Sequence, residues 1–195
     1  GTKCFVPLAG TASHIMVAAA VDGKTELFIV DAKNPGVKIG EREKTLGLYA
    51  LEMNPVTLDN CEVPAEDKLG GEEGCDYGLL LQRSRVAMSA MAAGVANASY
   101  EFAREYAKTR EQFGEPICYR QSIAFMLAEM AYEVDAIRLM TWKAASKLEA
   151  GKDATREAYL AKMYAGEMAM KIADYGVQIM GGHGYIREYP VERYY

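Results

Sequence analysis

The stretch Arg110-Glu111-Gln112-Phe113-Gly114-Glu115-Pro116-Ile117 decides how the second part of the chain is interpreted. Proline lacks a backbone N–H and restricts the residue before it, so the sequence predicts a break between helices here. Before the break, residues 77–110 contain no proline. After it, residues 120–150 carry apolar side chains three and four positions apart, as on the core-facing side of a helix. We therefore expect a tight turn with a long helix on each side.

A third helix is expected at about Ala154–Met180, after the turn Gly151-Lys152-Asp153. Its apolar residues do not fit one narrow stripe, and a helix apolar around much of its girth is buried on several sides. We expect another subunit to cover part of it. On the first helix Ala90, Gly94 and Ala98 recur every four residues, which would let another helix approach closely.

The first third of the chain is typical of strands. Asp22-Gly23 is a strong hairpin signal, and Pro55 argues for an edge strand or a bulge because proline cannot donate to the ladder. Short strands without intervening helices favour an antiparallel sheet or partial barrel. The runs that predict strands are His14–Val21, Thr25–Val30, Val37–Ile39 and Ala50–Leu58.

The expected fold class is thus α+β, an antiparallel partial β-barrel followed by an up-down helical bundle. The loop around Gly70-Gly71 places the expected domain boundary between residues 1–72 and 73–195. Both ends of the chain look cut, because no initiator Met opens it and it stops in the polar, aromatic run Glu192–Tyr195.

Composition narrows the classes of function. The chain has 22 basic and 27 acidic residues, a net charge of −5, which argues against a nucleic acid partner and weakly against anionic membranes. No apolar run approaches the length of a membrane span. Four scattered cysteines and two histidines make a metal site improbable and favour reduced thiols in a reducing compartment.

Three segments could carry chemistry, and each has a structural alternative. Arg110 at a helix end could bind a pyrophosphate through its planar fork, or could simply favour the helix C-terminus electrostatically while Phe113 packs. Glycines at 181, 182 and 184 could let a ligand lie against the backbone, or could form an ordinary glycine cap. His183 is expected to be a loop histidine rather than a base.

The third segment is Gln82-Arg83-Ser84-Arg85, in the early turns of the first long helix. Cations there oppose the helix dipole, which an anionic ligand would relieve. The alternative is a pair of solvated arginines with long apolar stems. From the residues alone the two interpretations are equally open.

Taken in order, these segments resemble the acyl-CoA dehydrogenase family. The resemblance covers nearly the whole chain, although each motif alone is weak. The matching pieces are Gly1–Val6, Val63–Glu66 before Leu69-Gly70, Arg85, Arg110–Ile117, Gln121, Leu127–Met130, Gln178–Tyr185 and Glu188–Arg193.

The resemblance implies an FAD enzyme, usually a tetramer built as a dimer of dimers, with a middle β-domain and a C-terminal four-helix bundle. It implies an acyl-CoA substrate, electron-transfer flavoprotein as acceptor, and a place in the cytoplasm or mitochondrial matrix. Arg110 would hold the FAD pyrophosphate with Gln112 and Phe113 beside it. Phe5 and Gln121 would also contact the cofactor. The adenosine end of an FAD held mainly by a neighbouring subunit would be approached by Gln178, Ile179, Met180, Gly181 and Gly182. Arg85 would lie near the thioester, and Gln82 and Ser84 on the CoA side.

Two departures concern the chemistry. Family members commonly show an aromatic residue and then Ile-Thr beside the flavin, where this chain has Phe5, Val6 and Pro7, and proline offers neither a hydroxyl nor an N–H. The family's glutamate base lies in most members beyond the position of Tyr195, and in a minority at the position of Ser84. No residue is therefore assigned as catalytic base, and the piece by itself is expected to be inactive.

Two alternatives share the same scaffold. One is a flavin monooxygenase or oxidase, which need not bind CoA. The other is a non-catalytic binding member whose base has been lost. A glutamate in a Tyr-Glu-Gly segment past residue 195 would favour the dehydrogenase.

Overall fold

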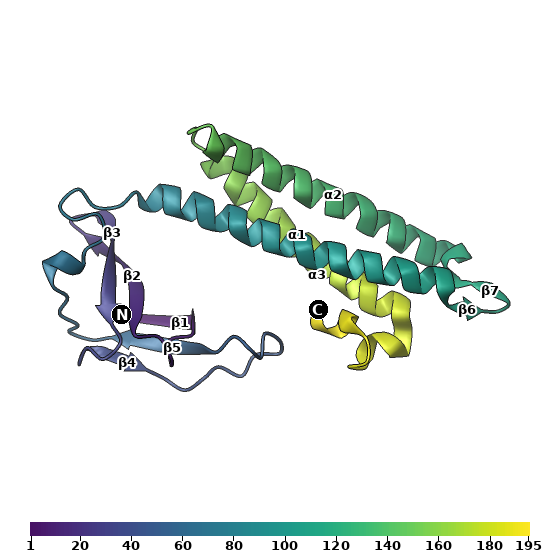
Figure 1. Cartoon of the computed structure of the whole chain (residues 1–195), viewed down its shortest axis with the longest axis horizontal. Coiled ribbons are helices and arrows are strands. Elements are labelled where there is room, and N and C mark those ends of the chain that lie inside the picture. Colours follow the sequence, from purple (N-terminus) through teal and green to yellow (C-terminus); the bar gives the residue numbers. More distant parts are fainter. The chain divides into compact units, whose positions relative to one another are not determined.

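The computed structural model describes all of residues 1–195 and divides into two compact units, residues 1–77 and 78–195. Figure 1 shows a small unit of strands and a unit of long helices. The arrangement, an antiparallel β region followed by a helical bundle, confirms the predicted fold class. The domain boundary after residue 72 remains a prediction.

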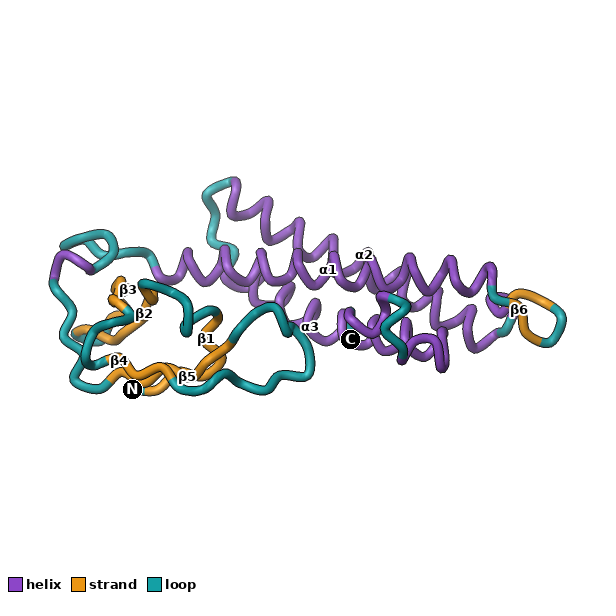
Figure 2. The backbone as a smooth tube through the Cα atoms, turned by 60° about the horizontal axis from the view of Figure 1, so that its bottom comes forward, coloured by secondary structure: helices purple, strands orange, loops and turns teal.

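The first unit contains only antiparallel strand pairs, which form a three-stranded sheet in the order β1-β5-β4 and a separate hairpin β2-β3. Figure 2 shows these strands within one part of the chain. A short 3₁₀ helix, η1, spans Ala65–Asp67. The strands are β1 (Thr2–Pro7), β2 (His14–Val21), β3 (Lys24–Asp31), β4 (Val37–Ile39) and β5 (Met53–Leu58).

The β2-β3 hairpin turns at the predicted dipeptide. Asp22 and Gly23 have φ of 49° and 81°, and Val21 pairs with Lys24 across the turn. Positive φ at both central residues matches the right-handed twist of the flanking strands. Leu27 and Val30 of β3 are buried. The hairpin predicted from Asp22-Gly23 is confirmed.

Pro55 lies in the central strand of its sheet, so the edge-strand alternative is wrong and the bulge is right. Lys3 pairs with Val56 and Val6 with Asn54, which leaves two residues of β1 opposite one proline. The irregularity falls where β5 has no N–H to donate. One of the two bulged residues, Phe5, has φ of 54° and is exposed. β5 begins at Met53 and is shorter than expected.

The second unit holds three long helices that run up and down, with boundaries within one residue of those predicted. The hairpin β6-β7 and the 3₁₀ helix η2 connect the first two, and two 3₁₀ helices follow the third. None of the helices is long and apolar enough to cross a bilayer. The elements are α1 (Tyr77–Thr109), β6 (Glu111–Gln112), β7 (Glu115–Pro116), η2 (Ile117–Tyr119), α2 (Gln121–Glu149), α3 (Thr155–Met180), η3 (Gly181–Tyr185) and η4 (Pro190–Arg193).

Small side chains let the helices meet. A Cβ on Gly176 of α3 would lie 2.3 Å from Ser99 Oγ of α1, so this approach requires glycine. The face predicted for close approach is a different one: Ala90 and Gly94 are exposed and Ala98 is half-buried. The close contact instead uses the neighbouring face of α1. The core joins all three helices through Ala96, Ala103, Ala107, Ile117, Met130, Val134, Ile137, Ala165, Ile172 and Ile179.

A row of polar pairs, which we call the α2–α3 seam, joins α2 to α3. Glu129 accepts hydrogen bonds from Lys171 and, at 2.9 Å, from Tyr175 Oη, while Glu133 accepts one from Tyr164. The bonds from Lys171 and Tyr175 lower the pKa of Glu129. The bond to Glu133, together with burial, raises the pKa of Tyr164 to about 12. Every charged group of the seam thus has a partner within the chain.

Candidate cofactor site

The turn between α1 and α2 is a hairpin with a strained tip. Phe113 and Gly114 form a two-residue loop between β6 and β7, with φ of 57° and 85°. Glycine adopts this conformation freely, whereas a bulky residue there is an outlier. The Phe113 side chain is nevertheless 92% exposed. Strain of this kind clusters at ligand-binding sites, and Figure 2 shows the hairpin projecting at one end of the helices.

The glycine-rich segment after α3 forms a second, open turn. Gly181 caps α3 with φ of 57°, so the glycine-cap interpretation is confirmed for this residue. A Cβ on Gly182 would meet no atom within 4 Å, whereas one on Gly184 would lie 2.5 Å from the Val177 carbonyl oxygen. Gly184 is therefore required for packing. The backbone at Gly181 and Gly182 is exposed and can be approached closely by a ligand.

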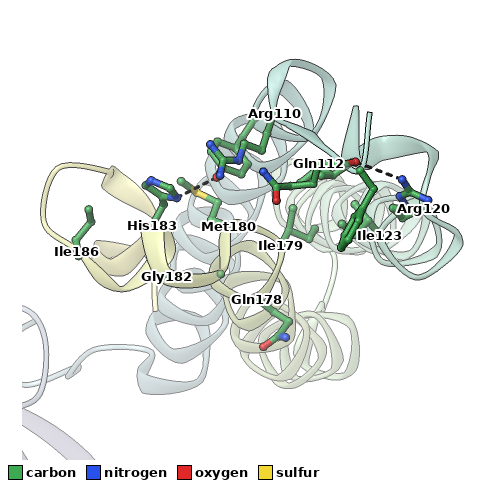
Figure 3. Close-up of a pocket in the computed structure, with 14 residues that line it drawn as sticks. Arg110, Gln112, Arg120, Ile123, Gln178, Ile179, Met180, Gly182, His183 and Ile186 are labelled. Atoms are coloured by element: carbon green, nitrogen blue, oxygen red, sulfur yellow. Dashed lines mark hydrogen bonds between the residues drawn. The ribbon is translucent and has the colours of Figure 1, made fainter. Parts of the chain in front are cut away.

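These two turns, far apart in the sequence, line one pocket of about 610 Å³. Figure 3 shows that its side chains come from the ends of α1 and α3 and from the start of α2. Eight of the ten residues predicted to contact a cofactor lie in its lining, namely Arg110, Gln112, Phe113, Gln178, Ile179, Met180, Gly181 and Gly182.

The charge in this pocket is not balanced within the chain. The guanidinium of Arg110 is exposed and has neither an ion-pair partner nor a hydrogen bond. Arg120 is the second cation in the lining. α2 begins beside the pocket, and no side chain caps its N-terminus. Because Arg120 is paired with Glu115, the unpaired Arg110 and the uncapped helix N-terminus are the features that favour an anion. The position of Arg110 just after α1 is also favourable for the dipole, so both predicted roles remain compatible.

An aromatic cluster fixes the glycine turn to α1. Tyr106 Oη lies 3.2 Å from His183 Nδ1, and the His183 ring meets Tyr189 edge-on at 5.4 Å. Phe102 lies against the same tyrosine at 6.3 Å. His183 lies in the 3₁₀ helix η3 and lines the pocket, and the expectation that it is not a base stays a prediction. These contacts join the glycine turn to α1 through Tyr106, and Figure 3 shows His183 and Arg110 lining the same pocket.

Other predicted residues lie outside this pocket. Gln121 is the exposed first residue of α2 and does not line it. Phe5 belongs to the other compact unit. Gln82 is buried: its Oε1 accepts from the Ala154 N–H at 2.9 Å, and its Nε2 donates to Asp153 at 3.1 Å. This amide ties α1 to the start of α3, a structural role that the sequence did not indicate.

The remaining substrate residues have few contacts. Ser84 is exposed, and the guanidinium of Arg85 lies 5.3 Å from the centre of the Tyr159 ring. The roles of Gln82, Ser84 and Arg85 toward a substrate remain predictions.

Sequence reasoning missed several pocket residues. The apolar ones, Ile123 and Ile186, resemble any other apolar residue of a helix or loop. Arg120 carried a weak signal, because a cation just before a helix opposes the dipole and needs a partner. Tyr106 carried none, since one tyrosine at helical spacing usually packs in a core.

Comparison with known proteins gives a consistent result. Residues 1–61 match the acyl-CoA dehydrogenase middle domain and residues 78–195 the acyl-CoA dehydrogenase C-terminal domain. The short-chain specific acyl-CoA dehydrogenase of Megasphaera elsdenii is 37% identical over 202 residues, covering 100% of this chain and 52% of the relative. The caffeyl-CoA reductase-Etf complex subunit CarC of Acetobacterium woodii is also 37% identical, covering 100% and 53%.

A solved structure agrees. Butyryl-CoA dehydrogenase from Megasphaera elsdenii superposes with a TM-score of 0.86 at 38% identity, covering 100% of this chain and 52% of its own. The chain therefore spans about half the length of the relatives that it matches. Two matched domains in the expected order, together with this fold, show that the chain belongs to the acyl-CoA dehydrogenase family.

Proposed function

We propose that the protein carrying this chain is an FAD-dependent acyl-CoA dehydrogenase and that the 110–116 hairpin and the 178–182 turn form part of its FAD site. One observation carries the proposal. Two segments that the sequence marks separately as cofactor-contacting, and that lie far apart along the chain, line a single pocket.

The residues present fit a dinucleotide. Arg110 has no partner within the chain, and its planar fork suits a pyrophosphate, to which it can donate two hydrogen bonds at once. The open backbone at Gly181 and Gly182 suits the flat, extended part of such a ligand. The pocket is large enough for part of FAD. Phe5 and Gln121 are proposed to contact other parts of it.

The proposed reaction is α,β-dehydrogenation of an acyl-CoA thioester, and FAD when bound supplies the hydride acceptor. Arg110 would neutralise the pyrophosphate, and Gln112, whose amide N–H can donate to it, and Phe113 would lie beside it. His183 holds the glycine turn in position through Tyr106. Serine at position 84 cannot act as a carboxylate base, so no residue of this chain is assigned that role.

We further propose that Arg85 lies near the thioester, with Gln82 and Ser84 on the CoA side of the site. Electron-transfer flavoprotein is the proposed acceptor, supported by a relative that is a subunit of an Etf complex. Apolar residues exposed on α3, Met163 and Met170, support an oligomer, proposed to be a dimer of dimers. Four free cysteines support a reducing compartment, cytoplasm or mitochondrial matrix.

Anaerobic titration of the full-length protein with acyl-CoA thioesters tests the proposal. The bound flavin is expected to lose its visible absorbance with thioesters of suitable length. Unchanged absorbance across straight, branched and aromatic acyl chains would overturn the dehydrogenase assignment. Reduced flavin that is reoxidised far faster by oxygen than by electron-transfer flavoprotein would favour the oxidase alternative.

A further inference from the structure

Arg120 contacts the strained hairpin at three points. Its Nη2 donates to the carbonyl oxygen of Gln112 at 3.2 Å and forms an ion pair with the Glu115 carboxylate at 3.1 Å. Its guanidinium carbon lies 5.5 Å from the centre of the Phe113 ring. One side chain from just before α2 thus contacts one residue in each arm of the hairpin and one at its tip. Figure 3 shows the bond between Arg120 and Gln112.

The hairpin has little else to hold it. Beyond its two-residue ladder, the Ile117 N–H donates to the Arg110 carbonyl oxygen at 2.8 Å. Phe113 is held in a left-handed conformation that a bulky residue avoids, with its ring in solvent. A two-stranded hairpin is marginal on its own, and one with a strained tip needs support from outside. The contacts of Arg120 are that support.

The conformation of the Arg120 side chain leaves one of its hydrogen-bond donors unsatisfied. The Nε atom is buried and has no hydrogen-bond partner, and a buried unsatisfied donor is unfavourable. The conformation of Arg120 is therefore unfavourable at Nε. It is stabilised by the contacts that Nη2 and the face of the guanidinium make with the hairpin.

We propose that Arg120 is a positioning residue that locks the hairpin and so presents Arg110, Gln112 and Phe113 to the pocket. The lock itself depends only on this chain. Its use in holding FAD rests on the proposed function. A general cation for an anionic ligand would need only a charge, whereas the lock needs a planar group that stacks and donates at once.

Hydrogen exchange of the ligand-free full-length protein, read over residues 110–117, tests the lock. Arg120→Met is expected to speed exchange at the Ile117 amide about tenfold, because local opening becomes easier. Arg120→Lys keeps the charge beside Glu115 but cannot stack or fork, so it should restore less than half of the protection. Glu115→Gln removes one contact of three and should have the smallest effect.

Arg138→Met is the matched control, because Arg138 also pairs with an acidic residue on α2, Asp135, but does not touch the hairpin. It should leave exchange over residues 110–117 unchanged. Equal exchange in Arg120→Met and the parent, or full recovery by lysine, would overturn the proposal.

The affinity for FAD separates this proposal from the proposed function. If the lock serves FAD binding, the FAD dissociation constant of Arg120→Met should be about tenfold higher than that of the parent. Arg120→Lys should recover only part of this loss of affinity. If Arg120→Met loosens the hairpin but binds FAD like the parent, the positioning role is overturned. If even the parent protein binds no FAD while the exchange result holds, the proposed function fails and the lock stands.

Discussion

The α2–α3 seam and the 110–116 hairpin differ in whether their charged groups have partners within the chain. In the seam, Glu129 and Glu133 each receive hydrogen bonds from residues of the facing helix. At the hairpin, Arg110 has no partner and Phe113 is exposed in an unfavourable backbone conformation. The polar groups of the seam are paired within the chain, whereas Arg110 at the hairpin is not.

This difference indicates which region serves stability and which serves a ligand. Groups that are paired within the chain gain nothing more from a cofactor. A charged group without a partner, on a strained backbone, is unfavourable unless a ligand supplies the missing partner. The same difference predicts that changes along α2 and α3 alter unfolding, and that changes at the hairpin alter binding.

The largest effect on stability is expected beside the seam. Met130 follows Glu129 on α2 and is 0% exposed. Met130→Ala should lower the free energy of unfolding by about 2–5 kcal/mol, through lost burial and the cavity left behind. Denaturant titration of the full-length protein measures this. Lys152→Ala, in the exposed turn between α2 and α3, is the control and should change stability by less than about 0.5 kcal/mol. Equal effects of the two would mean that the core is not where the structure has it.

At the hairpin, stability and binding are expected to move in opposite directions. Phe113→Asn creates an Asn-Gly turn, which suits positive φ at both central residues. Relief of strain, less the lost contact with Arg120, should stabilise the hairpin by about 1 kcal/mol and slow its amide exchange. Affinity for FAD should fall, because the apolar face is gone.

Phe113→Leu is the control for this comparison, since leucine keeps an apolar side chain without gaining turn propensity. A slower-exchanging Asn variant with unchanged FAD affinity would show that the strain at Phe113 has no part in binding.

The smallest effect is a pH dependence in the seam. Hydrogen bonds from Lys171 and Tyr175 hold the pKa of Glu129 below its usual 4.5. A carboxyl whose pKa is lowered by folding stabilises the native state above about pH 4.5 and loses this contribution as pH falls through the folded pKa. Glu129→Gln should therefore have a lower melting temperature than the parent at pH 7. In strong acid the two melting temperatures should be equal. A gap between the two melting temperatures that stays constant with pH would contradict the pairing.

Much of the fold was predictable because its signals are local. Asp22-Gly23 fixes a hairpin through its own backbone preferences, and the proline of residues 110–117 separates two helices whatever surrounds them. The position of Pro55 was predicted only in part. Proline forbids one hydrogen bond, and either an edge or a bulge in the partner strand satisfies that condition, so tertiary pairing had to decide.

The sequence predicted the separate segments of the pocket but not that they lie together in space. Arg110 and Gly182 can be recognised by residue type, whereas their meeting depends on how α1 and α3 pack. Tyr106 and His183 join across that contact, and nothing in either local sequence indicates it. Gln82 shows a further limit: the resemblance alone gave it a place on the CoA side, and nothing in its local sequence indicates the hydrogen bonds that join it to the start of α3.

The most direct test of the account compares the FAD dissociation constants of Arg110→Ala and the parent protein. Arg156→Ala, at the exposed opposite end of α3, serves as the matched control. Arg110→Ala is expected to lose about 1.5–3 kcal/mol of binding free energy, as for a lost charged hydrogen bond, with an unchanged melting temperature of the ligand-free protein. Equal flavin occupancy in Arg110→Ala, Arg156→Ala and the parent would contradict it.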